Sequence, residues 1–342
     1  MFSTKFFLVV ICCLLCFQTT HAAEWTTQKS GTLAWLHDVY FTTENKGFIG
    51  GSGGTFLATV DGGKTWTRRN IAVADSIEQI HFTGENTGWL LCQRNQFNRG
   101  AGNSSSYLMK TVDGGATWEQ RNFNADGSGR ERIAKIFSAK NGLIMMAIGE
   151  SGVIFALQDD EKTWKRIASP IRYLLLDGAF ADDFHATIAG AGASILFSED
   201  AGASWNKAMI YGDAKTKFNR VFFVNKNSGW TVGSAGAIYQ TVNGGKSWRA
   251  QTSNISFDLT DVFFLNTAEG WAVGDGGAIL HTTTGGNIWT PVSSDTNHKI
   301  ERIFFNGVKG YAVGFGGTIL SFDRTKTNEN SLAKPQILKR SN

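Results

Sequence analysis

Short apolar segments separated by glycine-rich turns recur along most of the chain. Four of them are closely similar: "DVYF" (38–41), "RVFF" (220–223), "DVFF" (261–264) and "RIFF" (302–305). A segment of the type "GWAVG" follows each, and then a Gly-rich turn and a third segment such as "AIL" or "TIL". Short apolar runs bounded by glycine turns are typical of strands in sheets that are covered on both faces. The pattern predicts an all-β fold.

A second phrase, "TVDGGKTW" at 59–66, closes each group of segments. It returns at 111–118 and 241–248, and in degraded form at 157–164, 198–205 and 282–289. The final tryptophans are Trp66, Trp118, Trp164, Trp205, Trp248 and Trp289, at spacings of 52, 46, 41, 43 and 41 residues. Self-similarity at a period near 40 residues indicates a β-propeller or a related array.

The ends of the chain decide the number of blades. The "GWAVG"-like phrase occurs seven times, whereas the tryptophan phrase is complete only six times, because no tryptophan follows 317–324. The segment "EWTTQ" (24–28) supplies an additional tryptophan, Trp25, 41 residues before Trp66. We therefore predict a seven-bladed β-propeller of four-stranded antiparallel blades over residues 23–324. The N-terminal strand completes the last blade and so removes open sheet edges.

The repeated phrase is interpreted as a structural turn. Asp61, Asp113, Asp200 and Asn243 stand where a short polar side chain accepts hydrogen bonds from nearby backbone N–H groups. The Gly-Gly pair that follows permits positive φ, and the tryptophan supplies an apolar anchor between neighbouring sheets. A catalytic site needs one asymmetric constellation, whereas this phrase recurs in every blade.

These phrases resemble the Asp-box, or BNR-repeat, propellers. The segment "DVFFLNTAEGWAVGDGGAILHTT" (261–283) is similar to the repeat of the photosystem II assembly and stability factor family. The resemblance extends from Trp25 to about Asp323, and it implies a non-enzymatic helper in the assembly of a membrane complex. Two of the boxes depart from the pattern, because 157–164 lacks the glycines and Thr284 replaces the expected aspartate.

Composition and the termini restrict the setting. Residues 1–22 read as a secretory signal peptide, with Lys5, an apolar run at 6–17 and a small-residue cleavage site at 20–22, which predicts export to a bacterial periplasm. The polar tail 325–342 is expected to be disordered.

Only Cys92 remains outside the signal, so disulfides are not expected, and no Cys/His spacing indicates a metal or cofactor. A net charge of +4 gives no indication of nucleic-acid binding. We expect a monomer that binds a protein partner and associates peripherally with a membrane.

Functional residues of a propeller are expected in loops on one face of the rigid scaffold. Because strands alternate in direction, the connections between blades share a face with the turns between strands two and three, and the Asp-containing turns lie opposite. Three segments on this loop face are longer than their counterparts: 93–105 and the connections that follow Trp118 and Trp205. They carry the basic residues Arg94, Arg99, Arg130, Arg132, Lys207, Lys215 and Lys217.

The residue that begins strand one of each blade is expected to form a ring near the channel mouth. The seven members are Asp38, Gln79, Lys135, Asp177, Arg220, Asp261 and Arg302. The basic members either steer an acidic partner loop or lipid headgroups to the mouth, or belong to a solvated rim in which three aspartates offset them. The predicted partner-binding set consists of this ring without Gln79, joined by Arg94, Arg99, Arg130 and Arg132.

Two other functions remain open from the sequence. The first is a sialidase-like glycoside hydrolase, since Asp boxes occur in those enzymes. "ERIF" (301–304) resembles their Arg-Ile-Pro motif except at Phe304, and Asp38, Asp177 and Asp261 are the candidate acids. The second is a carbohydrate-binding propeller of the cell envelope. Its candidate exposed aromatic residues are Phe97, Tyr211 and Trp35.

Overall fold

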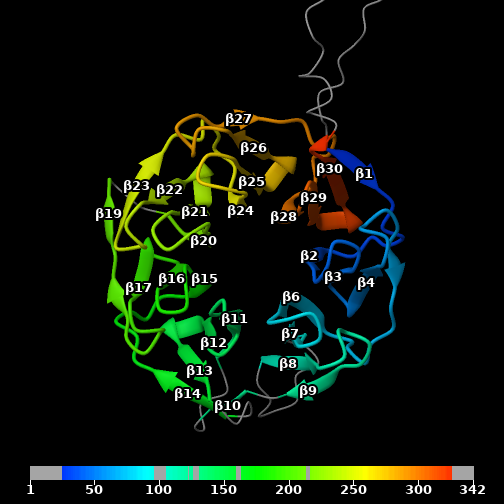
Figure 1. Ribbon diagram of the computed structural model, residues 1–342, viewed down its shortest axis with the longest axis horizontal. Coiled ribbons are helices and arrows are strands. Elements are labelled where there is room, and N and C mark those ends of the chain that lie inside the picture. The colour runs from blue at the N-terminus through cyan, green and yellow to red at the C-terminus, as the bar shows by residue number, and fades with distance from the viewer. Residues whose placement is uncertain are drawn as a thin grey trace, which may run out of the picture.

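The strands form sheets that are arranged in a ring around a central axis (Figure 1). The computed structural model describes residues 25–95, 105–121, 123–125, 131–158, 163–212 and 216–325. Within these residues the strands form seven sheets, which confirms the predicted seven-bladed propeller. The proposed signal peptide and all of the tail beyond residue 325 lie outside the described residues, as do Phe97, Arg99, Arg130 and Lys215.

The blades follow one another along the chain. Blade 1 is β2 (Leu36–Phe41), β3 (Gly47–Gly51), β4 (Thr55–Thr59) and β5 (Thr67–Arg68), and blade 2 is β6 (Ser76–Phe82), β7 (Gly88–Gln93), β8 (Ser106–Thr111) and β9 (Glu119–Arg121). Blade 3 contains β11 (Ile133–Ser138), β12 (Met145–Gly149), β13 (Ile154–Leu157) and β14 (Thr163–Ile167). Blade 4 contains β15 (Leu175–Phe180), β16 (Ala186–Gly190), β17 (Ser194–Ser198) and β18 (Asn206–Lys207).

The same order continues to the end of the ring. Blade 5 contains β20 (Phe218–Phe223), β21 (Gly229–Gly233), β22 (Ile238–Thr241) and β23 (Ser247–Gln251). Blade 6 contains β24 (Leu259–Phe264), β25 (Gly270–Gly274), β26 (Ile279–Thr282) and β27 (Thr290–Pro291). Blade 7 contains β28 (Ile300–Asn306), β29 (Lys309–Gly314), β30 (Ile319–Asp323) and, from the other end of the chain, β1 (Thr26–Gln28).

The N-terminal strand closes the ring as the sequence predicts. β1 pairs antiparallel with β30, with Thr26 opposite Ser321 and Gln28 opposite Ile319. Trp25, just before β1, is 1% exposed and stacks on Phe322 at a ring-centroid distance of 5.2 Å. It therefore occupies in blade 7 the place that the tryptophan of the repeated phrase occupies in the other blades.

Apolar side chains fill the seams between neighbouring blades. Trp248 lies in a buried cluster that joins Ile195 of blade 4 to Val221 of blade 5, and its indole N–H donates to the carbonyl of Gly245 at 2.9 Å. Trp66 packs in the same way against blade 7, 6.3 Å from Tyr311 between ring centroids. Each blade thus buries both of its faces, which explains why its strands are nearly continuous apolar runs.

The Asp-containing turns are structural units with the expected hydrogen bonds. Thr65 donates to Asp61 through both its backbone N–H, at 3.0 Å, and its hydroxyl, at 2.6 Å. Thr59 donates to the same carboxylate and accepts from the N–H of Gly63. These donors, with the Thr65 hydroxyl first, hold the pKa of Asp61 well below its usual range. Gly62 and Gly63 both have positive φ, as this turn requires.

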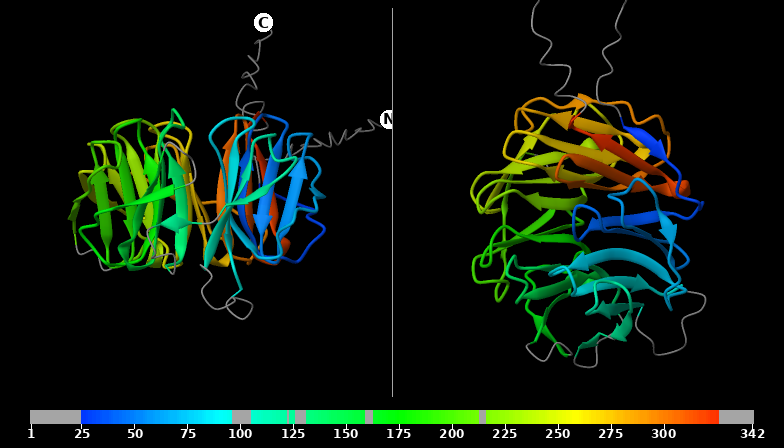
Figure 2. Two further views of the ribbon diagram at one scale, coloured as in Figure 1. Left: turned by 90° about the horizontal axis from the view of Figure 1, so that it is seen from below. Right: turned by 45° about the vertical axis from the view of Figure 1, so that its right-hand side comes forward.

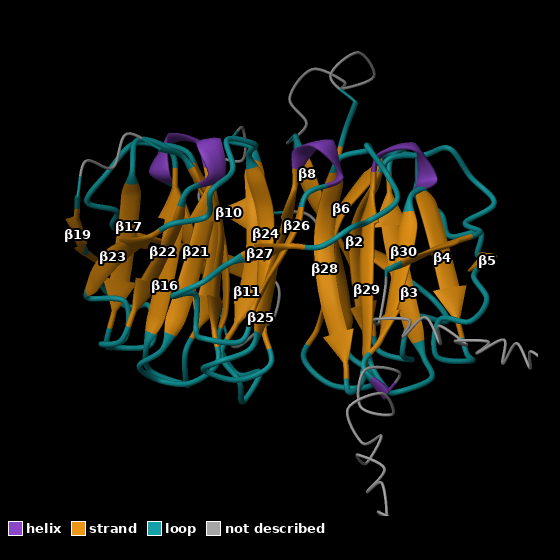
Figure 3. Ribbon diagram, turned by 90° about the horizontal axis from the view of Figure 1, so that it is seen from above, coloured by secondary structure: helices purple, strands orange, loops and turns teal. Residues whose placement is uncertain are grey.

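Strands run between two faces of the ring, seen from the side in Figure 2. The 3-10 turns that join strands two and three gather on one face (Figure 3), and they include η2 (Ser234–Gly236) and η4 (Phe315–Gly317). The connections between blades reach the same face, because the N–H of Ser234 bonds to the carbonyl of Lys217 just before β20. This loop face is the one expected to carry function.

Two of the longer connections have a use that the sequence did not reveal. β10 (Asn124–Ala125) and β19 (Met209–Tyr211) lie in the connections after Trp118 and Trp205. They add a fifth, parallel strand to the outer edge of blades 3 and 5. Part of the extra length therefore extends the sheets, where unpaired outer edges would otherwise remain.

Replacing Trp25 with alanine tests the closure of the ring. Because the indole is buried between blades 6 and 7, we expect Trp25→Ala to lower the free energy of unfolding by about 3–5 kcal/mol. Urea denaturation followed by tryptophan fluorescence measures the change. Thr27→Ala, at an exposed position of the same strand, is the matched control; equal unfolding midpoints for the two variants would mean that the N-terminal strand does not hold the ring closed.

Candidate functional site

A β-bulge places two consecutive residues of strand one on the channel side in every blade. In β2 the register shifts between Leu36 and Asp38, so His37 is the extra residue; equivalent shifts occur in the other six blades. A bulge breaks the alternation of a strand, which lets His37 and Asp38 both face the channel. The predicted ring residues are therefore the third or fourth residues of their strands and not the first. Each strand begins two or three residues earlier than predicted, because the bulge interrupts the regular alternation of the sequence pattern.

Charged members of this ring pair with one another across the blade junctions. Asp177 accepts from Lys135 at 3.1 Å and from Arg220 at 3.2 Å. Asp261 lies 2.9 Å from Nε of Arg220 and 3.3 Å from Nη1 of Arg302. Nε of Arg302 reaches Asp38 at 2.7 Å. Each arginine thus bridges two carboxylates.

Backbone contacts complete the circle where ion pairs are lacking. Asp38 accepts from the N–H of Ile80 at 2.9 Å and so joins blade 1 to blade 2. Gln79 accepts from the N–H of Ile136 at 2.9 Å and donates to its carbonyl at 2.7 Å, which joins blade 2 to blade 3. Together with the ion pairs, these bonds cross all seven junctions. We call the seven residues the polar belt.

Burial dominates the electrostatics of the polar belt. Asp38, Asp177 and Asp261 are 1–2% exposed, so they belong to the interior and not to a solvated rim. Burial raises the pKa of Asp261 to about 6 although Arg220 opposes the shift, and burial also raises the pKa of Asp38. Burial lowers the pKa of Lys135. The neutral sum of three aspartates and three cations keeps the buried charge compensated.

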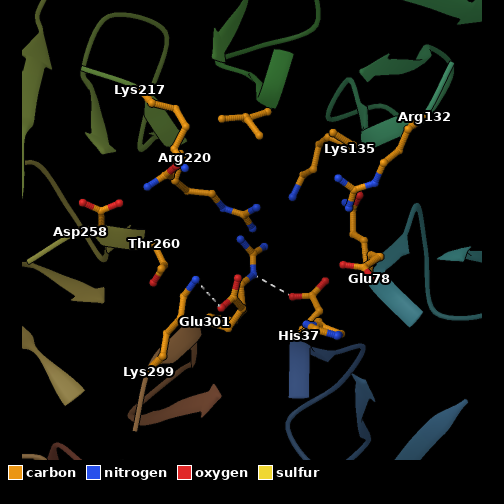
Figure 4. Close-up of a pocket in the computed structure, with 16 residues that line it drawn as sticks. His37, Glu78, Arg132, Lys135, Lys217, Arg220, Asp258, Thr260, Lys299 and Glu301 are labelled. Atoms are coloured by element: carbon orange, nitrogen blue, oxygen red, sulfur yellow. Dashed lines mark ion pairs between the residues drawn. The ribbon is translucent and has the colours of Figure 1, made fainter. Parts of the chain in front are cut away.

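A cavity of about 270 Å³ opens above the belt on the loop face, and we call it the mouth (Figure 4). Its wall has three tiers. The belt forms the deepest tier, the bulge residues the next, and the residues three positions before the belt the outermost: Arg132, Lys217, Asp258 and Lys299. The outermost residues are held by the turns between strands two and three, as when the carbonyl of Arg132 accepts from the N–H of Glu150 at 2.9 Å.

The outer tier of the mouth is basic on one side. Arg132 and Lys217 are exposed, and neither forms an ion pair with a residue that the structure describes. They flank blade 4, where Leu174 occupies the equivalent position. On the other side Lys299 is engaged by Glu301 at 3.2 Å, and Asp258 accepts from the N–H of Ala235. The free positive charge therefore lies over blades 3 to 5.

The structure brings only part of the predicted set together. The belt residues and Arg132 line the channel or its mouth. Arg94 does not line the mouth; its guanidinium stacks on the Tyr107 ring at 4.3 Å. Lys207 lies exposed in β18 at the outer edge of blade 4. Arg99 and Arg130 lie outside the described residues.

Several mouth residues were missed from the sequence. They are His37, Glu78, Asp258, Lys299 and Glu301, all at an offset of one or three residues before a belt position. The signal for the outer tier was the constant interval to the belt residue, visible once the repeats are aligned. The bulge tier had no signal, because the alternation of a regular strand turns that position away from the channel.

Within the described part of the chain, no helix is long and apolar enough to cross a membrane. Across the same residues, no group of three or more His, Cys, Asp or Glu side chains is arranged to hold a metal ion. The belt carboxylates are each bound to basic side chains and, through their second oxygen, to backbone N–H groups.

Fold and site together define a class: a seven-bladed Asp-box propeller with a charged channel mouth. The family model described as "Photosynthesis system II assembly factor YCF48" matches residues 17–104, 168–242 and 243–330, which is most of the chain. The chain therefore belongs to this family, as the sequence resemblance indicated.

Individual relatives are distant but span most of the length. The photosystem II assembly protein Ycf48 of Thermosynechococcus vestitus is 24% identical over 293 residues, covering 64% of this chain and 84% of the relative. The photosystem II assembly lipoprotein Ycf48 of a Nostoc species is 23% identical over 315 residues, covering 68% and 93%. Among solved structures, YCF48 bound to a D1 peptide superimposes with a TM-score of 0.71 at 19% identity, covering 89% of this chain and 96% of that one.

Removing one charge from the polar belt tests its structural role. In Asp261→Asn, Arg220 and Arg302 lose a shared counter-charge while the acceptor for the Ile303 N–H is retained. We expect a loss of unfolding free energy on the order of 3 kcal/mol, because a partly buried cation is left uncompensated. Urea denaturation measures it, with Glu78→Gln at the mouth as the matched control. Equal stability of the two variants would contradict a stabilising role for the Asp261 charge.

The pH dependence of His81 gives a second test near the belt. Burial, with Lys135 adding to it, lowers the pKa of His81 to about 4 from 6.5. The unfolded chain therefore binds a proton at this site between pH 6.5 and 4, and the stability that His81 contributes is lost as the pH falls through that window. The full shift corresponds to about 3 kcal/mol.

NMR titration of the His81 imidazole measures this pKa directly. His81→Gln should flatten the fall in stability between pH 6.5 and 4 relative to the wild type, and the difference between the two curves isolates the histidine. An imidazole that titrates near 6.5 would contradict the expectation.

Proposed function

We propose that this chain is an exported, non-catalytic scaffold that binds an acidic segment of a membrane-complex subunit at the mouth and so aids assembly of that complex. The observation that carries the proposal is the free positive charge of Arg132 and Lys217 above a cavity of about 270 Å³. Opposite charges at a rigid concave site attract and orient a flexible partner segment.

The belt supplies the floor of the proposed site. Arg220 and Arg302 direct Nε and Nη1 at the belt carboxylates, and neither Nη2 donates a hydrogen bond to a residue that the structure describes. Lys135 and Arg220 point toward the channel axis in Figure 4. An acidic side chain or chain terminus that enters the mouth meets these donors, and guanidinium groups bind carboxylates strongly.

Relatives support a peptide partner and an exported location. The structural neighbour at a TM-score of 0.71 binds a D1 peptide, and the matched curated proteins are named as photosystem II assembly proteins. Several relatives are named lipoproteins, in keeping with export and peripheral attachment to a membrane. The signal-like residues 1–22 support a periplasmic location under the same proposal.

The remaining predicted basic residues belong to a wider version of this surface. Arg94 is proposed to extend it over blade 2, and Arg99 and Arg130 to extend it through the longer segments of blades 2 and 3. All of these segments begin and end on the loop face. The partner would then lie across blades 2 to 5, where the mouth is most basic.

Charge reversal at the outer tier tests the proposal. We expect the double variant Arg132→Glu, Lys217→Glu to lose a membrane-complex partner that the wild type captures from detergent-solubilised membranes of the source organism. Both side chains are exposed, so the fold should be unchanged. Raising the salt concentration should weaken capture by the wild type, because the contact is electrostatic.

Lys226→Glu is the matched control, since Lys226 is exposed on the opposite face. It should retain the partner. Retention of every captured protein by the double variant, or equal loss in the control, would place the interface elsewhere.

A further inference from the structure

A second cavity of about 270 Å³ lies below the polar belt and is lined by belt residues and by residues one to three positions after them. Its upper boundary is the belt, because Gln79, Lys135, Arg220 and Arg302 line both cavities. The channel is thus divided into a charged mouth and this lower chamber. A cavity of about 150 Å³ already accommodates benzene, so the lower chamber has room for a small ring-bearing ligand.

Aromatic rings form a continuous wall on one side of the lower chamber. Phe222 and Phe263 lie 4.8 Å apart between ring centroids, Phe263 and Phe304 5.9 Å, and Phe304 and Tyr40 5.5 Å. These four rings come from blades 5, 6, 7 and 1, each two residues after a belt position, and all are partly exposed. Partly exposed rings in contact at these distances offer their faces and edges to a further aromatic group.

The wall is interrupted on the other side. Ala179 of blade 4 stands where blades 3, 5, 6 and 7 carry phenylalanine, and Phe137 of blade 3 also lines the chamber, packed against Gly178. His81 of blade 2 and Ser138 of blade 3 bond to each other at 2.8 Å. Ala179 presents no ring to the chamber, so the wall at blade 4 lacks the aromatic group that neighbouring blades supply. Its neighbours within the repeat show that the backbone at this position accepts a phenylalanine.

The upper boundary offers hydrogen-bond donors to this space. Nη2 of Arg220 and Nη2 of Arg302 donate no hydrogen bond to a residue that the structure describes, although both side chains are largely buried, at 15% and 19% exposure. A partly buried guanidinium with unused N–H groups is a site for a planar carboxylate.

From this geometry we infer that the lower chamber is a binding site for a small aromatic carboxylate. The ring lies between the Phe222–Phe263–Phe304 wall and Ala179, and the carboxylate accepts from the free Nη2 groups of Arg220 and Arg302. This site lies on the other side of the belt from the mouth and does not rest on the function proposed for the mouth, although both spaces share Arg220 and Arg302.

Benzoate is the probe, measured by isothermal titration calorimetry on the protein spanning residues 23–342. We expect saturable binding at one site per chain, and at least tenfold weaker binding of benzyl alcohol, which lacks the carboxylate, and of acetate, which lacks the ring. Ala179→Phe, which supplies the residue that four other blades carry, should weaken benzoate binding at least tenfold by filling the space. Val242→Ser, at an exposed turn outside the chamber, is the matched control and should bind as the wild type does.

An NMR titration of the wild type reports the location without any substitution. The His81 imidazole resonances should shift with benzoate and give the same dissociation constant as calorimetry. The inference is overturned if benzoate does not saturate, if benzyl alcohol binds as well as benzoate, if the folded Ala179→Phe variant binds as the wild type does, or if the His81 resonances do not move. The double variant Arg132→Glu, Lys217→Glu should still bind benzoate, so a failure at the mouth is distinguished from a failure in the lower chamber.

Discussion

Closure of the ring is the constraint on which the rest of the structure depends, and the polar belt enforces it at the axis. Apolar seams between blades are non-directional, so they hold neighbouring sheets together without fixing how many sheets make a circle. The belt contacts are directional, because each carboxylate joins a defined cation to a defined backbone N–H. Together with Trp25 in the last seam, they join the seven blades and the returning N-terminal strand into one closed ring.

Because of the β-bulge in strand one, the charges that hold the blades together and the charges that remain free for a partner belong to different residues. It lets the belt residue turn inward to its neighbours while the residue before it faces the mouth. Asp261 forms ion pairs with two arginines. Arg132 and Lys217, three residues before their belt positions, are exposed to solvent and available to a partner. Residues of the outer tier can therefore change without opening the ring.

The belt also makes the two ends of the channel chemically different. Above it the wall is charged, and below it four aromatic rings line the channel, yet Arg220 and Arg302 reach both spaces. One set of guanidinium groups thus closes the fold and offers unused donors at the axis. The repeated Asp turns stay on the periphery, where their side chains are satisfied within each turn.

The sequence by itself determined the architecture, because every copy of the repeat carries the same pattern of strands and turns. The tryptophan period, the seven "GWAVG"-like phrases and the orphan Trp25 were enough for the blade count, the closing strand and the structural role of Asp61. The membership of the belt was also readable, since alignment of the repeats brings Asp38 and Arg302 to one position.

Tertiary structure alone decided that these residues are buried and paired, and that Arg94 stacks on Tyr107 away from the mouth. It alone revealed the bulge residues, the outer strands β10 and β19, and the lower chamber. These depend on contacts between blades some 40 residues apart, and a local pattern carries no information about which of its side chains meet across the channel.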